Sequence, residues 1–536
     1  MADSDRTRAP RVIGVAGAGT MGAGIAQLAC LAGARTLLHD PDPAALESGL
    51  ERIAQHLDRG VSRGRLTHEQ AEQAKASLEP APSLEDLAPC ELVIEAAPER
   101  LEIKRALFER LGAVVSANCV LATNTSSLLV TALADAAPDP SRVVGMHFFN
   151  PPPVMRLLEV VAGMQSAPGA IAVARSAGAA MGKHVIDAAD GPGFIVNRCN
   201  RPFGLEALKL LQERIAAFDE IDRACRLGGG FRMGPFELMD LVGVDVGLDV
   251  ARSFYEQSFG EPRWRPSPIT VKTVAAGRLG RKAGRGYYEY PASGGHRPPD
   301  PEPPPLGGGG GVVVIAGDSP LAVQLREAAG EAGWAVADPL EAQELETPFL
   351  ILDLTGIEEP EAPLQGAPQA ICVAAGSLAS LDPGGSAVGF HALPPLRSTH
   401  LVELTRGPDS SDSAADAADR FFQTLGKHTL WVDDAPGLVL GRIVCQVANE
   451  AAFALGEGLA SAEDIDAGMV HGLSYPRGIL AWADEIGLDH VLSVLDALAL
   501  ERGEERYRAA PALRRLGWSG RVGRQTGAGF FEYGSN

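Results

Sequence analysis

Apolar and polar positions follow one another along the chain in the order that a parallel sheet with covering helices requires. A buried run at Val12–Ala16 precedes a glycine turn, a 3.6-residue apolar period covers residues 21–32, and a second apolar run ends at Asp40. Further buried runs stand in "CELVIEAAP", "CVLATNTSS" and "RVVGMHFFN". Strands that alternate with helices predict an α/β domain of the Rossmann type, with helices on both faces of its sheet.

After "DGPGFIVNR" the pattern changes to long helical periods, which predict an all-α domain that ends near Tyr290. Residues 291–311, "PASGGHRPPDPEPPPLGGGGG", are rich first in proline and then in glycine, which is typical of a linker that is extended at first and then flexible. Beyond it the strand–turn–helix plan begins again. The predicted domains are a Rossmann-type domain at 1–190, a helical domain at 191–292, a linker at 293–311, a degenerate Rossmann-like domain at 312–434 and a second helical domain at 435–536.

The second half matches the first at a constant offset of about 244 residues, so the two-domain unit is an internal duplication. His147 corresponds to His391 and Glu159 to Glu403. The second sheet domain is shorter by roughly 56 residues, counted from its first strand to the histidine. We therefore expect the second copy to have lost part of its sheet domain.

Composition excludes several classes of protein. The 536 residues suggest two to four domains, and a net charge of −21 argues against a nucleic-acid partner. Seven cysteines without C-x-x-C spacing fit a reducing compartment and give no metal signature. We see no apolar signal-peptide core and no membrane span, so we expect a cytoplasmic protein.

The glycine turn "GAGTMG" follows a strand and opens a helix, the context in which this motif indicates a dinucleotide site. The first glycine permits the tight turn, the second lets a pyrophosphate approach the helix N-terminus, and the third allows close helix packing. Asp40 is suited to accept hydrogen bonds from ribose hydroxyls and to repel a 2′-phosphate, which favours NAD over NADP. A plain capped turn is the alternative. The candidate NAD-binding residues are Gly17, Gly19, Thr20, Met21, Gly22 and Asp40.

The second copy has changed at this turn, where it reads "GDSP". Ser319 replaces the middle glycine, and Asp318 brings a carboxylate to the position of the pyrophosphate and can itself cap the helix. We therefore predict that the second copy binds no dinucleotide.

His147 and Glu159 both lie in apolar runs, twelve residues apart. Strand–loop–strand geometry can bring the two side chains together, and a buried carboxylate requires a partner. A glutamate that accepts one ring N–H fixes the tautomer of a histidine and suits it to act as a general base. A structural buried pair is the alternative, but the upstream cofactor turn favours catalysis.

The motifs "GAGTMGAGIA", "VIEAAPERLEIK", "TNTSSL", "HFFNPPPVMRLLEVV", "DGPGFIVNR", "MGPFELMD" and "LGRKAGRGYYEY" resemble the L-3-hydroxyacyl-CoA dehydrogenase family, in order and spacing. The match covers residues 10–290, and the degenerate second copy resembles the long bacterial subgroup that includes 3-hydroxyadipyl-CoA dehydrogenases of phenylacetate catabolism. The resemblance implies NAD-dependent oxidation of an L-3-hydroxyacyl-CoA.

The resemblance also implies roles for single residues. His147 is the base, Glu159 orients it, and Ser126 and Asn197 bind the substrate oxygens. The residues implied to contact the cofactor are Glu99, Lys104, Asn150 and Lys282. From the residues alone, Ser126 and Asn197 could equally cap a helix or turn, and Lys104 could be a solvated helix charge. The second copy has Gly441 and Gln525 in place of Asn197 and Lys282, so we interpret its histidine–glutamate pair as a structural relic.

Substrate and partner predictions are weaker. Arg59 and Arg63 are candidates for the CoA phosphates, although a solvated helix face is the default, and Arg201 is a candidate for a distal acyl carboxylate. The second helical domain is expected to act as an in-chain pseudo-dimer partner, with a further homo-oligomer possible. The competing functions are a 6-phosphogluconate or β-hydroxyacid type of dehydrogenase, which depends on a lysine base, and a non-enzymatic NAD-binding structural or sensing protein.

Overall fold

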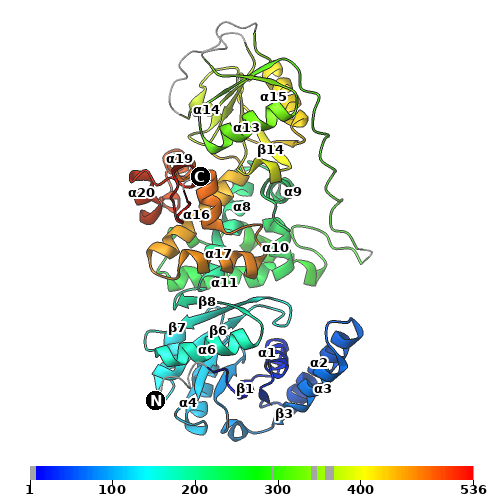
Figure 1. Ribbon diagram of the computed structural model, residues 1–536, viewed down its shortest axis with the longest axis vertical. Helices are drawn as coiled ribbons and strands as arrows, with labels where there is room; N and C mark the ends of the chain where they lie inside the picture. Colours follow the sequence, from blue (N-terminus) through cyan, green and yellow to red (C-terminus); the bar gives the residue numbers. More distant parts are fainter. Residues whose placement is uncertain (1–7, 293, 340–346, 357–366, 535–536) are drawn as a thin grey trace. The chain divides into compact units, whose positions relative to one another are not determined.

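The computed structural model describes residues 8–292, 294–339, 347–356 and 367–534 (Figure 1). Contacts within the chain divide it into two compact units. The first unit comprises residues 1–198 and 457–473, and the second comprises residues 199–456 and 474–536. The first unit therefore contains a segment from the second half of the sequence, which the duplication alone did not predict.

The first unit is built on an eight-stranded sheet with the order β3-β2-β1-β4-β5-β6-β7-β8. Its strands are β1 (Val12–Ala16), β2 (Arg35–His39), β3 (Leu78–Ala81), β4 (Leu92–Glu95), β5 (Val120–Thr123), β6 (Val143–Phe148), β7 (Leu157–Ala162) and β8 (His184–Ala189). All neighbouring pairs are parallel except β6 and β7, which run antiparallel. The first strand has the predicted bounds, and the parallel α/β sheet is confirmed.

Helices cover this sheet and supply most of its apolar core. They are α1 (Thr20–Leu31), α2 (Pro43–Ser62), α3 (His68–Ala76), α4 (Leu101–Val114), α5 (Val130–Ala134), α6 (Pro168–Ala180), the short α7 (Val196–Cys199) and, from the second half, α17 (Ala462–Leu473). The helix predicted over residues 21–32 is α1, shifted by one residue. Residues such as Val15, Ile25 and Phe148 form one continuous core with the inner faces of α1, α2, α3 and α6.

The second unit contains a smaller sheet of seven strands with the order β10-β9-β11-β12-β13-β14-β15. They are β9 (Val312–Ala316), β10 (Ala335–Ala337), β11 (Leu350–Asp353), β12 (Gln369–Cys372), β13 (Val388–His391), β14 (Leu401–Arg406) and β15 (His428–Trp431). Among the described residues no helix stands between β10 and β11, where the first sheet has α2 and α3. The duplicated but shortened sheet domain is thus as predicted.

The helices of both copies make up the rest of the second unit. They are α8 (Arg201–Glu213), α9 (Phe218–Arg223), the π-helix η3 (Ala224–Gly228), α10 (Pro235–Val242), α11 (Val244–Gln257), α12 (Pro268–Ala275), α13 (Pro320–Glu331), α14 (Leu378–Leu381), α15 (Asp412–Thr424), α16 (Leu440–Gly456), α18 (Ile479–Ile486), α19 (Leu488–Arg502) and α20 (Pro511–Trp518). No helix in the described ranges has the length and apolar character that crossing a membrane requires.

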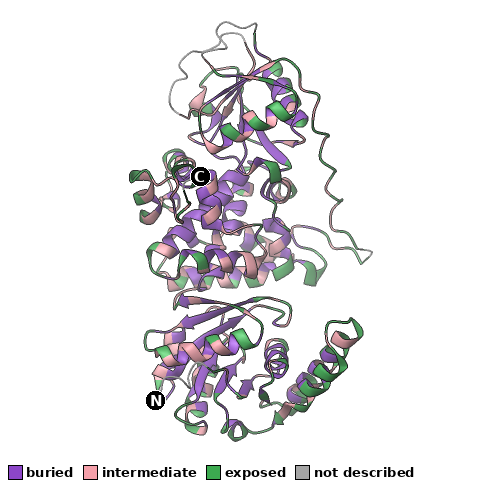
Figure 2. Ribbon diagram, viewed as in Figure 1, coloured by how far each residue is buried: buried purple, intermediate pink, exposed green. Residues whose placement is uncertain are grey.

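Helix α16 is buried on nearly every side (Figure 2), because it packs against α8, α18, α19 and α20. It nevertheless carries Arg442, whose side chain is fully buried. The Nε of Arg442 donates to Glu206 Oε1 at 2.5 Å, and its Nη1 donates to Glu213 Oε2 at 2.7 Å. Tyr507 Oη also donates to Glu206, at 3.0 Å. Helices from the two copies are therefore joined by a buried ionic network.

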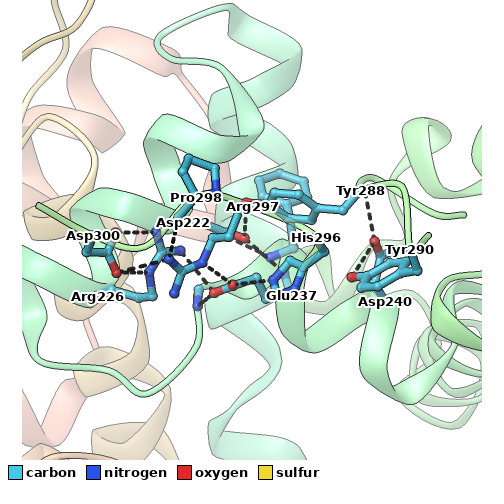
Figure 3. A network of polar contacts seen from close by, with 12 residues as sticks. Asp222, Arg226, Glu237, Asp240, Tyr288, Tyr290, His296, Arg297, Pro298 and Asp300 are labelled. Atoms are coloured by element: carbon cyan, nitrogen blue, oxygen red, sulfur yellow. Dashed lines mark hydrogen bonds and ion pairs between the residues drawn. The ribbon is translucent and has the colours of Figure 1, made fainter. Parts of the chain in front are cut away.

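The first part of the linker is bound to the first helical domain (Figure 3). His296 Nε2 and Arg297 Nε both lie 2.7 Å from Glu237 Oε1, and Asp300 accepts two hydrogen bonds from Arg226. Arg226 also donates to Glu237 Oε2 at 2.9 Å. Burial alone would raise the pKa of Glu237, but the Gly234 N–H and these cationic partners lower it to about 2.

This attachment belongs to the first copy alone. At the offset of the duplication, Val470 and Ala481 stand where the first copy has Arg226 and Glu237. The buried carboxylates that fold the helical domain itself are kept: Asp240 accepts the Tyr287 and Tyr288 N–H groups, and Asp484 accepts those of Phe530 and Phe531. The Arg226–Glu237 pair is thus specific to the first copy, where it binds the linker while Glu237 also accepts the Gly234 N–H at the start of α10.

The buried ionic network gives a first prediction. Arg442→Met keeps most of the apolar volume but removes the closer of the two guanidinium groups that pair with the fully buried Glu206, leaving it Arg506 at 3.2 Å, so we expect a loss of about 3 kcal/mol in unfolding free energy. The matched control is Arg35→Met, which breaks the solvent-screened Arg35–Glu79 pair and is expected to cost much less. Chemical denaturation measures both; equal losses would contradict the assignment.

Candidate active site

The glycine turn lies at the carboxyl edge of the first sheet, between β1 and α1. Gly17 has φ +115°, and a Cβ there would lie 2.6 Å from Ala96 O. A Cβ at Gly22 would lie 1.7 Å from Gly17 O. Both glycines are therefore required by the backbone, as the motif predicted.

Gly19 has a different role, because an added Cβ would meet no atom within 4 Å. The space in front of this residue is open, and α1 begins at Thr20 and continues through Met21 without a side-chain cap. Free N–H groups at a helix N-terminus, next to open space, suit a pyrophosphate. Asp40 Oδ2 accepts the Ala18 N–H at 2.8 Å, which fixes its carboxylate against the turn. The residues present fit an NAD-type dinucleotide.

The turn "NTSS" after β5 is organised by a single carboxylate, that of Glu99. Its Oε1 accepts the Thr125 hydroxyl at 2.6 Å and the backbone N–H groups of Ser126 and Ser127 at 2.9 and 3.1 Å. The Ser126 hydroxyl lies 3.5 Å from the same oxygen, too far for a strong bond. Glu99 thus fixes the backbone and leaves the Ser126 hydroxyl available to a ligand.

Lys104 is not a solvated helix charge, which was one of the two readings of the sequence. Its side chain is 1% exposed, and Nζ lies 2.7 Å from Glu95 Oε1 and 3.2 Å from Glu99 Oε2. Burial alone would raise the pKa of Glu99, but the Lys104 ammonium and hydrogen bonds from Thr125 and Ser126 lower it to about 2. Lys104 acts on the site through Glu99, which it holds ionised.

Sequence analysis missed two residues that shape this edge. Glu95, the last residue of β4, is fully buried and accepts the Thr123 hydroxyl and the Ala97 N–H, both at 2.6 Å. Asn124 Oδ1 accepts the Phe148 N–H at 2.8 Å and so binds β6 next to its histidine. A glutamate inside the apolar run "LVIE" was a readable signal, whereas Asn124 carried none beyond its place in the motif.

His147 and Glu159 are register partners on the antiparallel strands β6 and β7. His147 Nδ1 lies 2.5 Å from Glu159 Oε2, and both side chains are buried. With Nδ1–H donated to the carboxylate, Nε2 is the ring nitrogen that can accept a proton. The Phe149 and Phe194 rings lie beside the imidazole, at 4.5 and 5.7 Å between centroids.

Glu159 also binds the turn that carries Asn197. Its Oε1 accepts the backbone N–H groups of Ile195 and Val196, each at 3.0 Å. The turn is shaped by Gly193 and Phe194, both with positive φ. Asn197 follows as the second residue of α7, half-buried. One carboxylate thus positions the imidazole and the start of the segment with the amide.

The remaining candidates lie on exposed or separate parts of the chain. Asn150 is exposed just after β6, and Arg59 and Arg63 are exposed at the end of α2. In the second unit, Lys282 pairs with Asp245 at 2.6 Å, and the Arg201 guanidinium stacks over Phe254 at 5.1 Å. Their contacts with ligands stay predictions.

The second copy keeps its glutamate contacts and loses the pair. Glu403 Oε1 accepts the Val439 and Leu440 N–H groups, as Glu159 does with Ile195 and Val196. His391 Nε2 instead lies 3.0 Å from His490 Nε2, and His391 Nδ1 has no partner in the described chain. A Cβ at Gly441 would lie 2.1 Å from His391 Cε1. The imidazole occupies the space where the first copy has its asparagine.

The dinucleotide turn of the second copy is closed by its own side chain. Ser319, in place of the middle glycine, is the N-cap of α13, and its hydroxyl accepts the Ala322 N–H at 3.3 Å. The sequence suggested Asp318 as the helix cap. The structure shows Ser319 in this role, because the serine lies one residue closer to the helix. Ser319 occupies a donor that a phosphate would need.

Family models match three stretches of the chain. The model described as 3-hydroxyacyl-CoA dehydrogenase, NAD binding domain, matches residues 12–191. The model described as 3-hydroxyacyl-CoA dehydrogenase, C-terminal domain, matches twice, over residues 193–290 and 437–533. The two matches of the C-terminal model confirm the duplication of the helical domain.

Similar proteins agree with these models. The 3-hydroxyadipyl-CoA dehydrogenase of Escherichia coli K12 is 36% identical over 94% of this chain and 97% of its own length. A 3-hydroxybutyryl-CoA dehydrogenase of Bradyrhizobium diazoefficiens is 41% identical over 52% of this chain and 94% of its own length. The crystal structure titled 3-hydroxybutyryl-CoA dehydrogenase from Escherichia coli K12 superposes with a TM-score of 0.80 at 34% identity, and it covers 95% of this chain and 98% of its own.

The two buried glutamates should respond differently to a change to glutamine. Burial raises the pKa of Glu403 to about 8, although backbone hydrogen bonds oppose the shift. A raised pKa stabilises the fold fully below the unfolded value of about 4.5, and this stability is lost as pH rises through about 8. Glu403→Gln removes that loss. Relative to the native chain, we expect the variant to gain on the order of 4 kcal/mol between pH 5 and pH 9.

Thermal or urea unfolding at the two pH values measures this gain. The matched variant is Glu159→Gln, whose amide cannot accept all three N–H groups that reach the native carboxylate. It should lose about 1–3 kcal/mol at both pH values. A Glu403→Gln gain that does not change with pH would refute the protonated state of Glu403.

Proposed function

The chain belongs to the 3-hydroxyacyl-CoA dehydrogenase family, and we propose that its first copy alone oxidises an L-3-hydroxyacyl-CoA to the 3-oxoacyl-CoA with NAD. The observation that carries this proposal is the combination of an open glycine turn and the His147–Glu159 pair at one edge of one sheet. In the second copy Ser319 closes the turn and His391 has left its glutamate.

The residues of the first copy divide the work. His147 Nε2 takes the proton of the substrate C3 hydroxyl, because Nδ1 is held by Glu159. The charge that develops on the imidazole lies 2.5 Å from a carboxylate, which stabilises it where little water enters. Asn197 and the Ser126 hydroxyl hold the reacting oxygen. Held at the glycine turn by residues 17–22 and Asp40, NAD would supply the acceptor for the hydride of C3.

The binding residues prepare the nucleotide site. The N-terminus of α1 donates N–H groups to the pyrophosphate, Gly19 leaves room for it, and Asp40 accepts the ribose hydroxyls. Glu99 and Lys104 fix the turn after β5, so their contribution to cofactor binding is made through backbone position.

The second half is proposed to serve as an in-chain pseudo-dimer partner. Support comes from α8 and α16, equivalent helices of the two copies that pack together through the Arg442–Glu206 pair. A cytoplasmic location is supported by the seven cysteines, all of which are buried without a disulfide bond.

The competing functions lack such support. A dehydrogenase of the 6-phosphogluconate type requires a lysine base, and Lys104 is committed to Glu95 and Glu99. A sensing protein would need NAD binding without turnover, whereas the first copy retains all four proposed catalytic residues in its sequence.

The substrate of this chain is proposed to be a 3-hydroxyacyl-CoA with a distal carboxylate, such as 3-hydroxyadipyl-CoA. Support comes from the relative of that name, which matches 94% of the chain. Arg201, which follows the "NRCN" segment with Asn197, is the proposed cation for the distal group.

The base is tested by changing the equivalent histidine in each copy. His147→Gln should lower kcat by about 10²–10⁴-fold, because no group then takes the hydroxyl proton, while NAD affinity stays within about twofold. His391→Gln, in the copy without a pair, should leave kcat unchanged. NADH absorbance with 3-hydroxybutyryl-CoA measures turnover. Normal turnover by His147→Gln would refute the mechanism.

The distal group is tested with a panel of L-3-hydroxyacyl-CoAs that includes 3-hydroxyadipyl-CoA. Arg201→Ala should raise the KM for 3-hydroxyadipyl-CoA at least about tenfold and leave the straight-chain substrates within about twofold, because only the former presents an anion to a cation. An unchanged ratio of kcat/KM values between the two substrates would exclude Arg201 as the distal site.

A further inference from the structure

The His147–Glu159 pair depends on the position of the turn that precedes Asn197. Two of the three hydrogen bonds that Glu159 accepts come from this turn, through Ile195 and Val196. A movement of the turn therefore shifts Glu159, and with it the ring nitrogen that faces the substrate. What packs against the turn decides the geometry of the base.

The turn is buried by α17, a helix of the second copy that packs on β7 and β8 in the first unit; Figure 1 labels α17 and β8. Two glycines of α17 face it. A Cβ at Gly468 would lie 3.3 Å from both Ile195 and Val196. A Cβ at Gly472 would lie 2.8 Å from Leu157, a neighbour of Glu159 on β7, and 3.2 Å from Val196. The helix backbone therefore lies in direct contact with the turn.

Two polar contacts fix the start of this segment to the same sheet. The Ala189 N–H, at the end of β8, donates to Leu459 O at 2.8 Å. Arg198, the residue after Asn197, pairs with Glu457 at 2.7 Å. The segment 457–473 is therefore held at both the strand and the turn.

The first copy makes the same contacts with the other sheet. Its π-helix η3 packs on β14, and a Cβ at Gly228 would lie 3.0 Å from Leu440. The Asp433 N–H donates to Ile215 O at 2.8 Å, which is the counterpart of Ala189 and Leu459. Gly228 and Leu440 correspond to Gly472 and Val196 at the offset of 244. The copies have exchanged equivalent helices, and only one exchange faces a catalytic pair.

We infer that α17 of the degenerate copy is a positioning element for catalysis in the first copy, with Gly472 and Gly468 as positioning residues. They act through Val196, Ile195 and Leu157 on Glu159, and through Glu159 on His147. The inference rests on the proposed function and deepens it, because it gives the inactive half a defined part in the reaction.

The test compares two glycines in equivalent contacts, one against each sheet. Gly472→Val adds a side chain against Val196 and Leu157, and Gly228→Val adds one against Leu440 and β14. Gly472→Ala and Gly228→Ala are the milder pair, in case a valine variant does not fold. All four are made in the full chain and compared for kcat, NAD affinity and the pH profile of kcat/KM.

We expect the Gly472 variants to lower kcat by about 10- to 100-fold and to shift the apparent pKa of the base, with NAD affinity within about twofold. The Gly228 variants should keep kcat and the pH profile of the native chain. Equal effects of both pairs, or an unchanged profile in the Gly472 variants, would overturn the inference. A native chain without turnover would refute the proposed function instead.

Discussion

The structure of the first copy depends on how one buried carboxylate, that of Glu159, is supplied with donors. A carboxylate without water is tolerated only when its oxygens are hydrogen-bonded. Glu159 receives three N–H groups, from the His147 ring and from the Ile195 and Val196 backbone. The same requirement therefore fixes the tautomer of the base and the turn before Asn197. Stability and catalysis share one set of contacts here.

The second copy separates these two roles. Glu403 keeps its backbone donors, because the turn before α16 still has to be held against β14. His391 has moved against His490, into space that Gly441 leaves free, and burial and that neighbour lower its pKa well below the usual range. A glutamate retained without its histidine is what a purely structural role predicts. Glu403 is kept for the fold.

Local pattern predicted local structure well. The bounds of β1 and the three glycines of the turn follow from neighbours in sequence, and the shortened second sheet follows from comparing the two copies. Partners distant in sequence were not readable. Lys104 was ambiguous because its partner Glu95 lies on another element, the strand β4, and an apolar period does not show how a helix and a strand pack together. The packing of α17 on the sheet of the other copy was missed for the same reason. An apolar period shows which face of a helix is buried, but it does not show which of the two copies buries that face.

The exchange explains how the second half can lose its chemistry and still be required. The dinucleotide turn of the second copy belongs to the second unit, not to the unit that contains the His147–Glu159 pair, so Ser319 and Asp318 could replace the motif. Gly472 and Leu459 cannot be replaced as easily. A side chain at Gly472 would clash with Leu157 on β7, and a shift of the Leu459 carbonyl would break its hydrogen bond with Ala189 on β8. In the second copy, substitutions are therefore restricted in α17, which faces the His147–Glu159 pair. They are less restricted in the former dinucleotide turn of that copy.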